Sequence, residues 1–157
     1  MEFLAWLETT AVANAIRTIP WIYPTLETAH YIGLALLVGG ILLTDLRLLG
    51  FAARLPLKSM LGLLRFVWAG FAINVASGTL IFIYGAAQFS GNPAFRVKMV
   101  LMLLAGINAL IFTRAAAGAG ERWIASGHVP AAVKLVATAS VILWLGVVTA
   151  GRWMAYV

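Results

Sequence analysis

Two ionisable side chains stand close together in an apolar stretch of the chain, and their types suggest chemistry. Glu27 and His30 are three residues apart within residues 21–44. In a helix this spacing places both side chains on one face. Small and apolar residues continue roughly the same face: Gly33, Leu37 and Gly40. Because ionisable groups within a membrane span are costly and usually face a bundle interior or a cavity, we place a candidate site here.

A histidine at this depth can be an axial ligand of a b-type haem, and a later apolar segment offers a second ligand. His30 would lie about 12 Å below the start of its span, and Met102 about 8 Å below the start of its own. Histidine and methionine are both known haem ligands; Met99 is the alternative methionine. Cations at the same end would pair with haem propionates or a quinone: Arg96, Lys98 and Arg152. Glu27 would hold the second imidazole nitrogen of His30.

Simpler interpretations of the same residues stay open. His30 can be a hydrogen-bonded packing residue, and the methionines can fill a helix interface. Glu27 can form an ion pair with one of three arginines: Arg17, Arg96 or Arg152. We expect Asn74 and Asn108 to hydrogen-bond across helices, with a quinone contact as the alternative. His128 lies in a polar link on the other side of the membrane, so ligation by two histidines would need two copies of His30.

Composition places the chain among integral membrane proteins. Hydrophobic residues make up 63% of its 157 residues and charged residues only 10%. Cysteine is absent, which excludes disulfides, thiolate metal sites and iron–sulfur clusters. The net charge of +6 comes from basic residues at the ends of apolar segments, where membrane orientation and lipid head groups explain them. We therefore expect contact with membrane lipid and none with nucleic acid.

The elements that position the site are four apolar segments, each near the roughly 20 residues that cross a bilayer. We predict spans at residues 21–44, 66–87, 95–113 and 135–153, preceded by an interfacial amphipathic helix at about 3–17. The segment 114–134 is predicted as a polar link. Small or polar residues of the second span share a face, as in tight helix contacts: Gly70, Asn74, Ser77, Gly78 and Gly85. The predicted fold is an all-α membrane protein, a four-helix transmembrane bundle forming a single domain over residues 1–157.

The distribution of basic residues predicts the orientation. The two links on one side carry seven: Arg47, Arg54, Lys58, Arg65, Arg114, Arg122 and Lys134. The other side carries four: Arg17, Arg96, Lys98 and Arg152. The positive-inside rule places the richer side in the cytoplasm. Both termini of this multi-pass protein are then periplasmic, in a bacterial cytoplasmic (inner) membrane.

Three patches carry a resemblance to known families. They are Glu27-x-x-His30-x-x-Gly33 with the following Gly-Gly40 and Asp45-Leu-Arg-Leu-Leu-Gly50, Arg96-Val-Lys98-Met with Asn108, and Gly151-Arg-Trp153. The chain resembles a group of small bacterial four-span membrane proteins of uncharacterised function. It is more distantly similar to the CopD and HemJ type. The HemJ-like relation implies haem binding and protoporphyrinogen oxidation by His30 with Lys98, and the CopD-like relation implies copper handling, for which this chain has few ligands.

These observations lead to two functional hypotheses. The first is a haem b-binding membrane protein for electron transfer or for anchoring a redox partner protein; whether it is also a HemJ-like oxidoreductase stays open. The second is a cofactor-free structural or transport subunit that binds lipid, quinone or a partner membrane protein. The faces of the first two spans that carry small residues, which we call the smooth faces (Gly33 and Gly40 on the first span, Gly70 and Gly78 on the second), would then serve assembly. This includes assembly into a homo-oligomer.

Overall fold

The computed structural model describes residues 2–51, 55–56, 62–126 and 128–157, and within these it describes no side chain of residues 115–126. The described residues form helices and no strand: α1 (Glu2–Glu8), α2 (Ala11–Thr18), α3 (Ile22–Leu49), α5 (Leu64–Tyr84), α6 (Ala86–Gly91), α7 (Pro93–Ser126) and α8 (Ala131–Trp153). Four stretches are long and apolar enough to cross a membrane, namely α3, α5, the Pro93–Arg114 part of α7, and α8. The predicted all-α four-helix membrane bundle is therefore confirmed.

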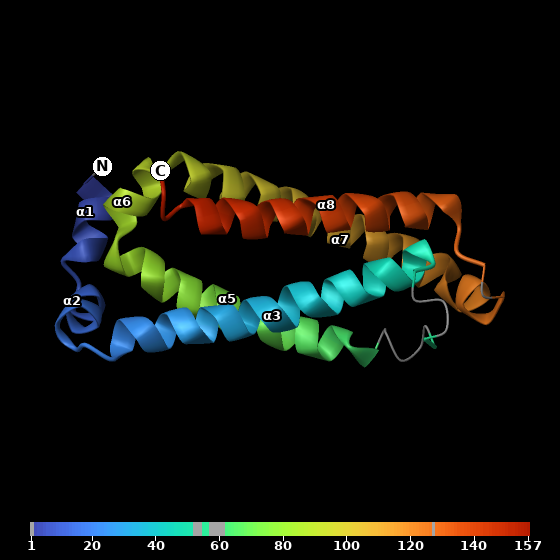
Figure 1. The fold of residues 1–157 in the computed structure, drawn as a ribbon, viewed down its shortest axis with the longest axis horizontal. Helices are drawn as coiled ribbons and strands as arrows, with labels where there is room; N and C mark the ends of the chain where they lie inside the picture. Colours follow the sequence, from blue (N-terminus) through green and yellow to red (C-terminus); the bar gives the residue numbers. More distant parts are fainter. Residues whose placement is uncertain (1, 52–54, 57–61, 127) are drawn as a thin grey trace.

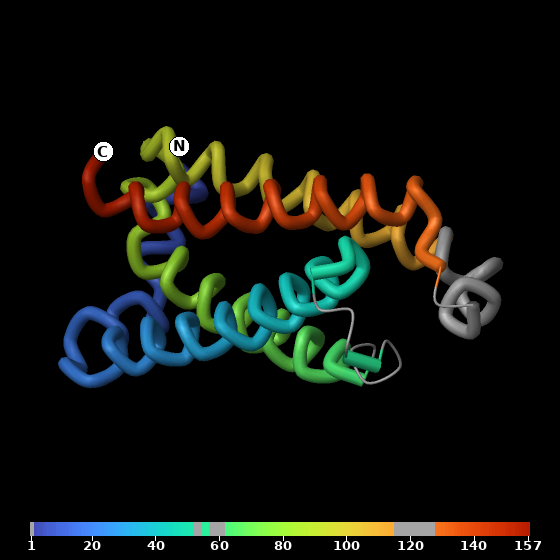
Figure 2. The backbone as a smooth tube through the Cα atoms, turned by 45° about the vertical axis from the view of Figure 1, so that its right-hand side comes forward, coloured from blue at the N-terminus to red at the C-terminus, as the bar shows by residue number. Residues whose placement is uncertain are grey.

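The four long helices form two antiparallel pairs (Figure 1). Helix α3 packs along α5, and α7 packs along α8. The pairs are joined mainly through α3 and α8, and the tube in Figure 2 follows both pairs from a second direction. Both chain termini lie at one end of the bundle, which we call the terminal end, and we call the opposite end the loop end (Figure 1).

The N-terminal segment is two short helices, whereas the sequence predicted one. The break occurs at Thr9 and Thr10, whose hydroxyls donate to the carbonyls of Trp6 and Leu7, both at 2.7 Å. The Thr10 hydroxyl also accepts from the Ala13 amide at 3.3 Å and so caps α2. Hydroxyl side chains compete with helical backbone bonds in this way and favour helix starts. Both helices lie across the terminal end of the bundle (Figure 1).

Two long helices extend beyond their predicted ends. Helix α3 continues past Thr44 to Leu49, and Gly50 ends it in the left-handed conformation, with φ of 100°. Glycine adopts this conformation without the steric cost of a Cβ atom. Asp45 and Arg47 are therefore helical residues of α3. Helix α7 continues to Ser126, through most of the segment that was predicted as a link.

Two polar side chains fix the terminal end and thereby the first turns of α7. Asn92 accepts from the Phe95 amide at 3.1 Å, and its side-chain nitrogen donates to the carbonyls of Met154 at 3.1 Å and Val157 at 2.7 Å. The Glu8 carboxylate of α1 accepts from the Ala87 amide at 2.8 Å, at the start of α6. These bonds satisfy amides that a helix start leaves without partners.

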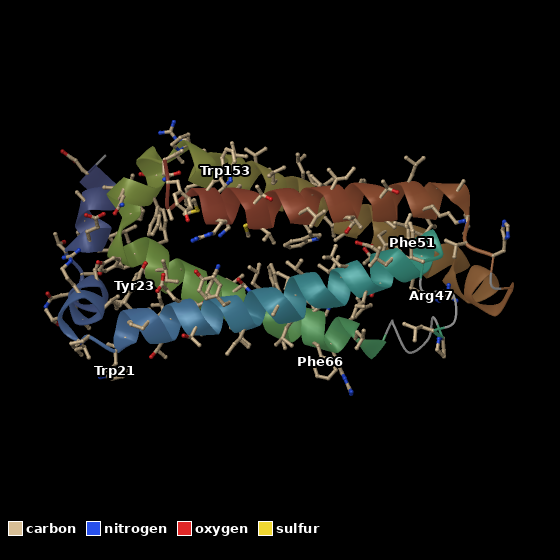
Figure 3. The ribbon with its side chains drawn as sticks, in the orientation of Figure 1. Trp21, Tyr23, Arg47, Phe51, Phe66 and Trp153 are labelled. Atoms are coloured by element: carbon tan, nitrogen blue, oxygen red, sulfur yellow. The ribbon has the colours of Figure 1, made fainter. Side chains whose placement is uncertain are left out.

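The outer surface of the bundle is apolar, as a lipid-facing surface requires. Large exposed side chains occur on all four long helices, among them Tyr31, Trp68, Leu103 and Leu135. Figure 3 places Trp21, Tyr23 and Trp153 towards the terminal end, and Arg47 and Phe51 towards the loop end. Aromatic residues near the ends of spans suit the interfaces of a bilayer.

Candidate functional site

The site is built where α3 and α5 cross with their backbones in contact. A Cβ atom added to Gly70 would lie 2.6 Å from the Gly33 carbonyl oxygen and 2.6 Å from the Leu37 nitrogen. A Cβ atom on Gly33 would lie 2.6 Å from the side-chain nitrogen of Asn74. The smooth faces predicted for the first two spans thus face each other. Small residues allow this approach, which brings the side chains beside the crossing within hydrogen-bond distance.

His30 lies next to this crossing and bonds to Ser77 of α5. Its Nδ1 atom is 3.0 Å from the Ser77 hydroxyl oxygen, and that hydroxyl donates to the Ile73 carbonyl at 2.6 Å. Because a serine hydroxyl has one proton to give, the network assigns the proton of the neutral imidazole to Nδ1. Nε2 then carries the lone pair, and it has no hydrogen-bond partner in the described part of the chain.

Gly78 leaves the room that the imidazole occupies. A Cβ atom at this position would lie 3.2 Å from Cε1 of His30. This contact is tighter than ordinary van der Waals distance, so a larger residue would displace the ring. The ring is half-buried and is held between a hydrogen bond and a glycine surface. Its orientation is therefore fixed by α5.

Lys98 brings a positive charge from the second helix pair. Its side chain runs along Gly151 of α8, where a Cβ atom would lie 3.7 Å from Nζ and 3.8 Å from Cδ and Cε. Lys98 and His30 are close enough to interact electrostatically. All four long helices therefore contribute to one cluster, which we call the His30 site: His30, Ser77, Gly78, Lys98 and Gly151.

Glu27 does not hold the second imidazole nitrogen, contrary to the prediction. Ser77 occupies that position, while Glu27 hydrogen-bonds to the Tyr23 hydroxyl on its own helix. The i, i+4 spacing of Tyr23 and Glu27 favours this bond within the helix, whereas Ser77 approaches His30 only through the tight crossing.

The arginines at the terminal end bond to neutral oxygens. Arg17 donates to the Tyr84 carbonyl at 3.3 Å, and Arg96 donates to the Ser90 carbonyl at 2.9 Å. Arg152 donates to the Tyr156 hydroxyl at 2.7 Å, and its guanidinium carbon lies 5.1 Å from the centre of that ring. All three are exposed and keep further N–H groups available at the rim.

The two methionines differ in their surroundings. Met102 follows Lys98 by one helical turn, so it lies on the same face of α7, and it is half-buried. Met99 has an exposed fraction of 47%. Of the two, Met102 is the one that shares the face of α7 carrying Lys98. In the described residues, no group of three or more His, Asp or Glu side chains could hold a metal ion.

The two asparagines that were predicted to hydrogen-bond across helices differ in the partners they have. Asn108 donates to the Val136 carbonyl of α8 at 3.2 Å, which confirms the predicted bond across helices. Asn74 donates to the Gly70 carbonyl of its own helix at 3.1 Å, so that part of the prediction was wrong. His128 is exposed in the link before α8, far along the chain from His30.

One buried carboxyl group was missed when the first span was predicted to end at Thr44. Asp45 is 7% exposed and hydrogen-bonds to Ser140 of α8. Helical spacing could have revealed this burial. If the first span is continued past Thr44, Asp45 lies next to the inward-facing side of the helix, which carries Leu37, Ile41, Thr44 and Leu48.

Comparisons with known proteins extend over nearly the whole chain. Residues 3–157 match the model of DUF6644, a family of unknown function. The comparison with curated proteins found no match, and the comparison with solved structures found none. The similarity to the CopD and HemJ type accordingly stays a prediction. With 155 residues matched by one model, this four-span chain belongs to the DUF6644 family.

Proposed function

We propose that this protein binds haem b through Nε2 of His30 and acts in electron transfer or as the membrane anchor of a redox partner protein. The observation that supports this most is the His30–Ser77 hydrogen bond, which leaves Nε2 as the imidazole atom able to bind iron. Ligating histidines generally donate their other ring N–H to a fixed acceptor, which sets the tautomer and the ring orientation. Bound haem would supply one-electron chemistry.

The charges around His30 fit an anionic ligand. Lys98 is half-buried at membrane depth, and among the described residues no carboxylate acts on it. A cation in that position is costly unless an anion or water compensates it. A haem propionate would do so, and the exposed N–H groups of Arg96 and Arg152 at the rim suit a second propionate.

Met102 is the residue of this chain that we propose would hold the haem iron together with His30. It shares a face of α7 with Lys98, whose ammonium group is near His30. We do not extend the proposal to Met99, because its side chain is largely exposed. The alternative is ligation by His30 from two copies of the chain, which would make a homo-oligomer the functional unit.

We further propose that the terminal end faces the periplasm of a bacterial cytoplasmic membrane. The excess of basic residues at the loop end supports this orientation. The His30 site would then serve a partner or a quinone on the periplasmic side of the membrane.

The direct test is the visible absorption spectrum of detergent-purified protein, first oxidised and then reduced with dithionite. We expect a Soret band with sharp reduced α and β bands, and we expect His30→Ala to remove them while the matched control His128→Ala keeps them. A featureless spectrum from protein expressed with ample haem would refute haem binding.

A second variant tests the role of Ser77. Ser77→Ala removes the acceptor for Nδ1, and the loss of such a partner typically weakens metal binding about 10–100-fold. Thr79→Ala, on an exposed position of the same helix, is the control and should leave haem affinity unchanged. Equal haem affinity in the two variants would mean that Ser77 does not orient a ligand.

A second candidate function is binding of a quinone or a lipid head group without haem, in a cofactor-free structural or transport subunit. The observation that favours it is the lysine beside His30, because its ammonium group can donate to a carbonyl or phosphate oxygen. Solvent extraction of the purified protein followed by mass spectrometry separates the two candidates. Quinone or phospholipid retained in native protein but lost in Lys98→Met, with a featureless spectrum, would select this function.

A further inference from the structure

A buried carboxyl group, that of Asp45, lies at the contact between the two helix pairs. Asp45 of α3 and Ser140 of α8 are each 7% exposed, and their side chains share a hydrogen bond. Oδ2 of Asp45 is buried and has no hydrogen-bond partner among the described residues. Nearby, Leu48 of α3 packs with Val133 and Ala137 of α8 in an apolar cluster. A carboxyl group with one orphaned oxygen therefore sits between tightly packed helices.

None of the charged groups that the structure describes on the surrounding elements compensates this carboxyl group. On α3, Arg47 donates to the Leu55 carbonyl at 2.6 Å, and on α5, Arg65 lies over the Phe66 ring. The other described ones at the loop end are exposed: Arg114 on α7, Lys134 on α8 and His128 in the link. Within the described residues, burial and Ser140 are the influences on Asp45, and no charge is among them.

Physical chemistry then decides which form of the carboxyl group suits the site. An ionised carboxylate taken out of water costs several kcal/mol even after the protein relaxes, unless a cation or several donors compensate it. A neutral carboxylic acid avoids that cost and offers an O–H group in addition to acceptors. The one hydrogen bond from Ser140 favours the anion, but a buried carboxylate needs several donors or a cation, so the site suits the neutral acid better.

We propose that Asp45 is a proton-binding site in the half of the bundle opposite His30, and that its proton stabilises the contact of α8 with α3. Asp45 lies 15 residues after His30, about 22 Å away along the helix, so the two groups are separate sites. Asn108 extends the polar layer to α7 through its bond to Val136, one helical turn before Ser140. Release of the proton would leave a buried anion, which favours water entry and separation of the two helix pairs.

Infrared spectroscopy of the purified protein tests the proposal and does not depend on haem. The C=O stretch of a protonated carboxyl group is distinct from carboxylate bands and shifts in D₂O. We expect such a band in mildly acidic solution, absent in Asp45→Asn and retained in Glu27→Gln, which removes the other carboxyl group of α3 and is the matched control. A band that is missing from the native protein, or retained in Asp45→Asn, would overturn the proposal.

A second variant keeps the carboxyl group and serves if Asp45→Asn fails to fold. Ser140→Ala removes the hydrogen-bond partner with little change in volume. We expect the C=O band to move to higher frequency, as it does when a carboxyl group loses a hydrogen bond, whereas Ser90→Ala should leave it in place. An unmoved band in Ser140→Ala would show that the protonated group is not Asp45.

Discussion

The crossing of α3 and α5 gives the sharpest test of how the His30 site is built. In Gly70→Ala the added methyl group meets backbone atoms, since the Gly33 oxygen and the Leu37 nitrogen each lie 2.6 Å from the Cβ position. A rotamer change cannot relieve these contacts. Ordinary van der Waals contact begins near 3.4 Å, so the helices must separate locally by about 0.8 Å.

This displacement has two consequences whose size can be estimated. Overpacking of this kind typically costs about 1–3 kcal/mol, and the better helix propensity of alanine returns roughly 0.5–1 kcal/mol. We expect a net loss of about 1–2 kcal/mol in the free energy of unfolding. The His30–Ser77 distance of 3.0 Å would increase to about 3.8 Å if the shift reached it, which is beyond hydrogen-bond range.

The assay is unfolding by SDS titration in mixed micelles, followed by the fluorescence of the chain's six tryptophans. Gly39→Ala, on the facing helix α3, is the matched control, because no other described residue places an atom within 4 Å of its Cβ position. Alanine there should be neutral or slightly stabilising. If Gly70→Ala unfolds at the same SDS fraction as Gly39→Ala, the argument that backbone contact fixes this crossing is refuted.

Two further predictions concern the terminal end. Asn92→Ala removes the cap of α7 and both bonds to the C-terminal residues, so we expect a loss of about 1–2 kcal/mol in the same titration. Asn92→Asp keeps the accepting oxygen and should lose less; equal losses would show that the cap bond to Phe95 contributes nothing. Glu8→Ala removes the cap of α6, so hydrogen exchange at the Ala87 amide should become faster. Glu8→Gln, which retains an accepting oxygen, should exchange more slowly than Glu8→Ala, and identical rates would contradict the capping role.

Sequence determined the overall architecture because a bilayer imposes simple requirements. Each span must be apolar, long enough and helical, so four helices could be predicted from hydropathy and length. Glycine spacing also identified the faces of α3 and α5 that meet, since small residues are what close approach between membrane helices requires. His30 and Lys98 were recognisable because ionisable side chains at membrane depth are rare.

The partners of these residues were decided by tertiary structure. Helical periodicity tells which residues share a face, but in lipid the outer face is as apolar as the inner one, so the sequence does not reveal which helix covers which face. The hydrogen-bond partner of His30 is therefore Ser77, 47 positions away in the sequence, and not its neighbour Glu27. Asp45 shows the same limit: it is buried because α3 continues to Gly50 and α8 packs over it, a contact that depends on how the two helix pairs assemble.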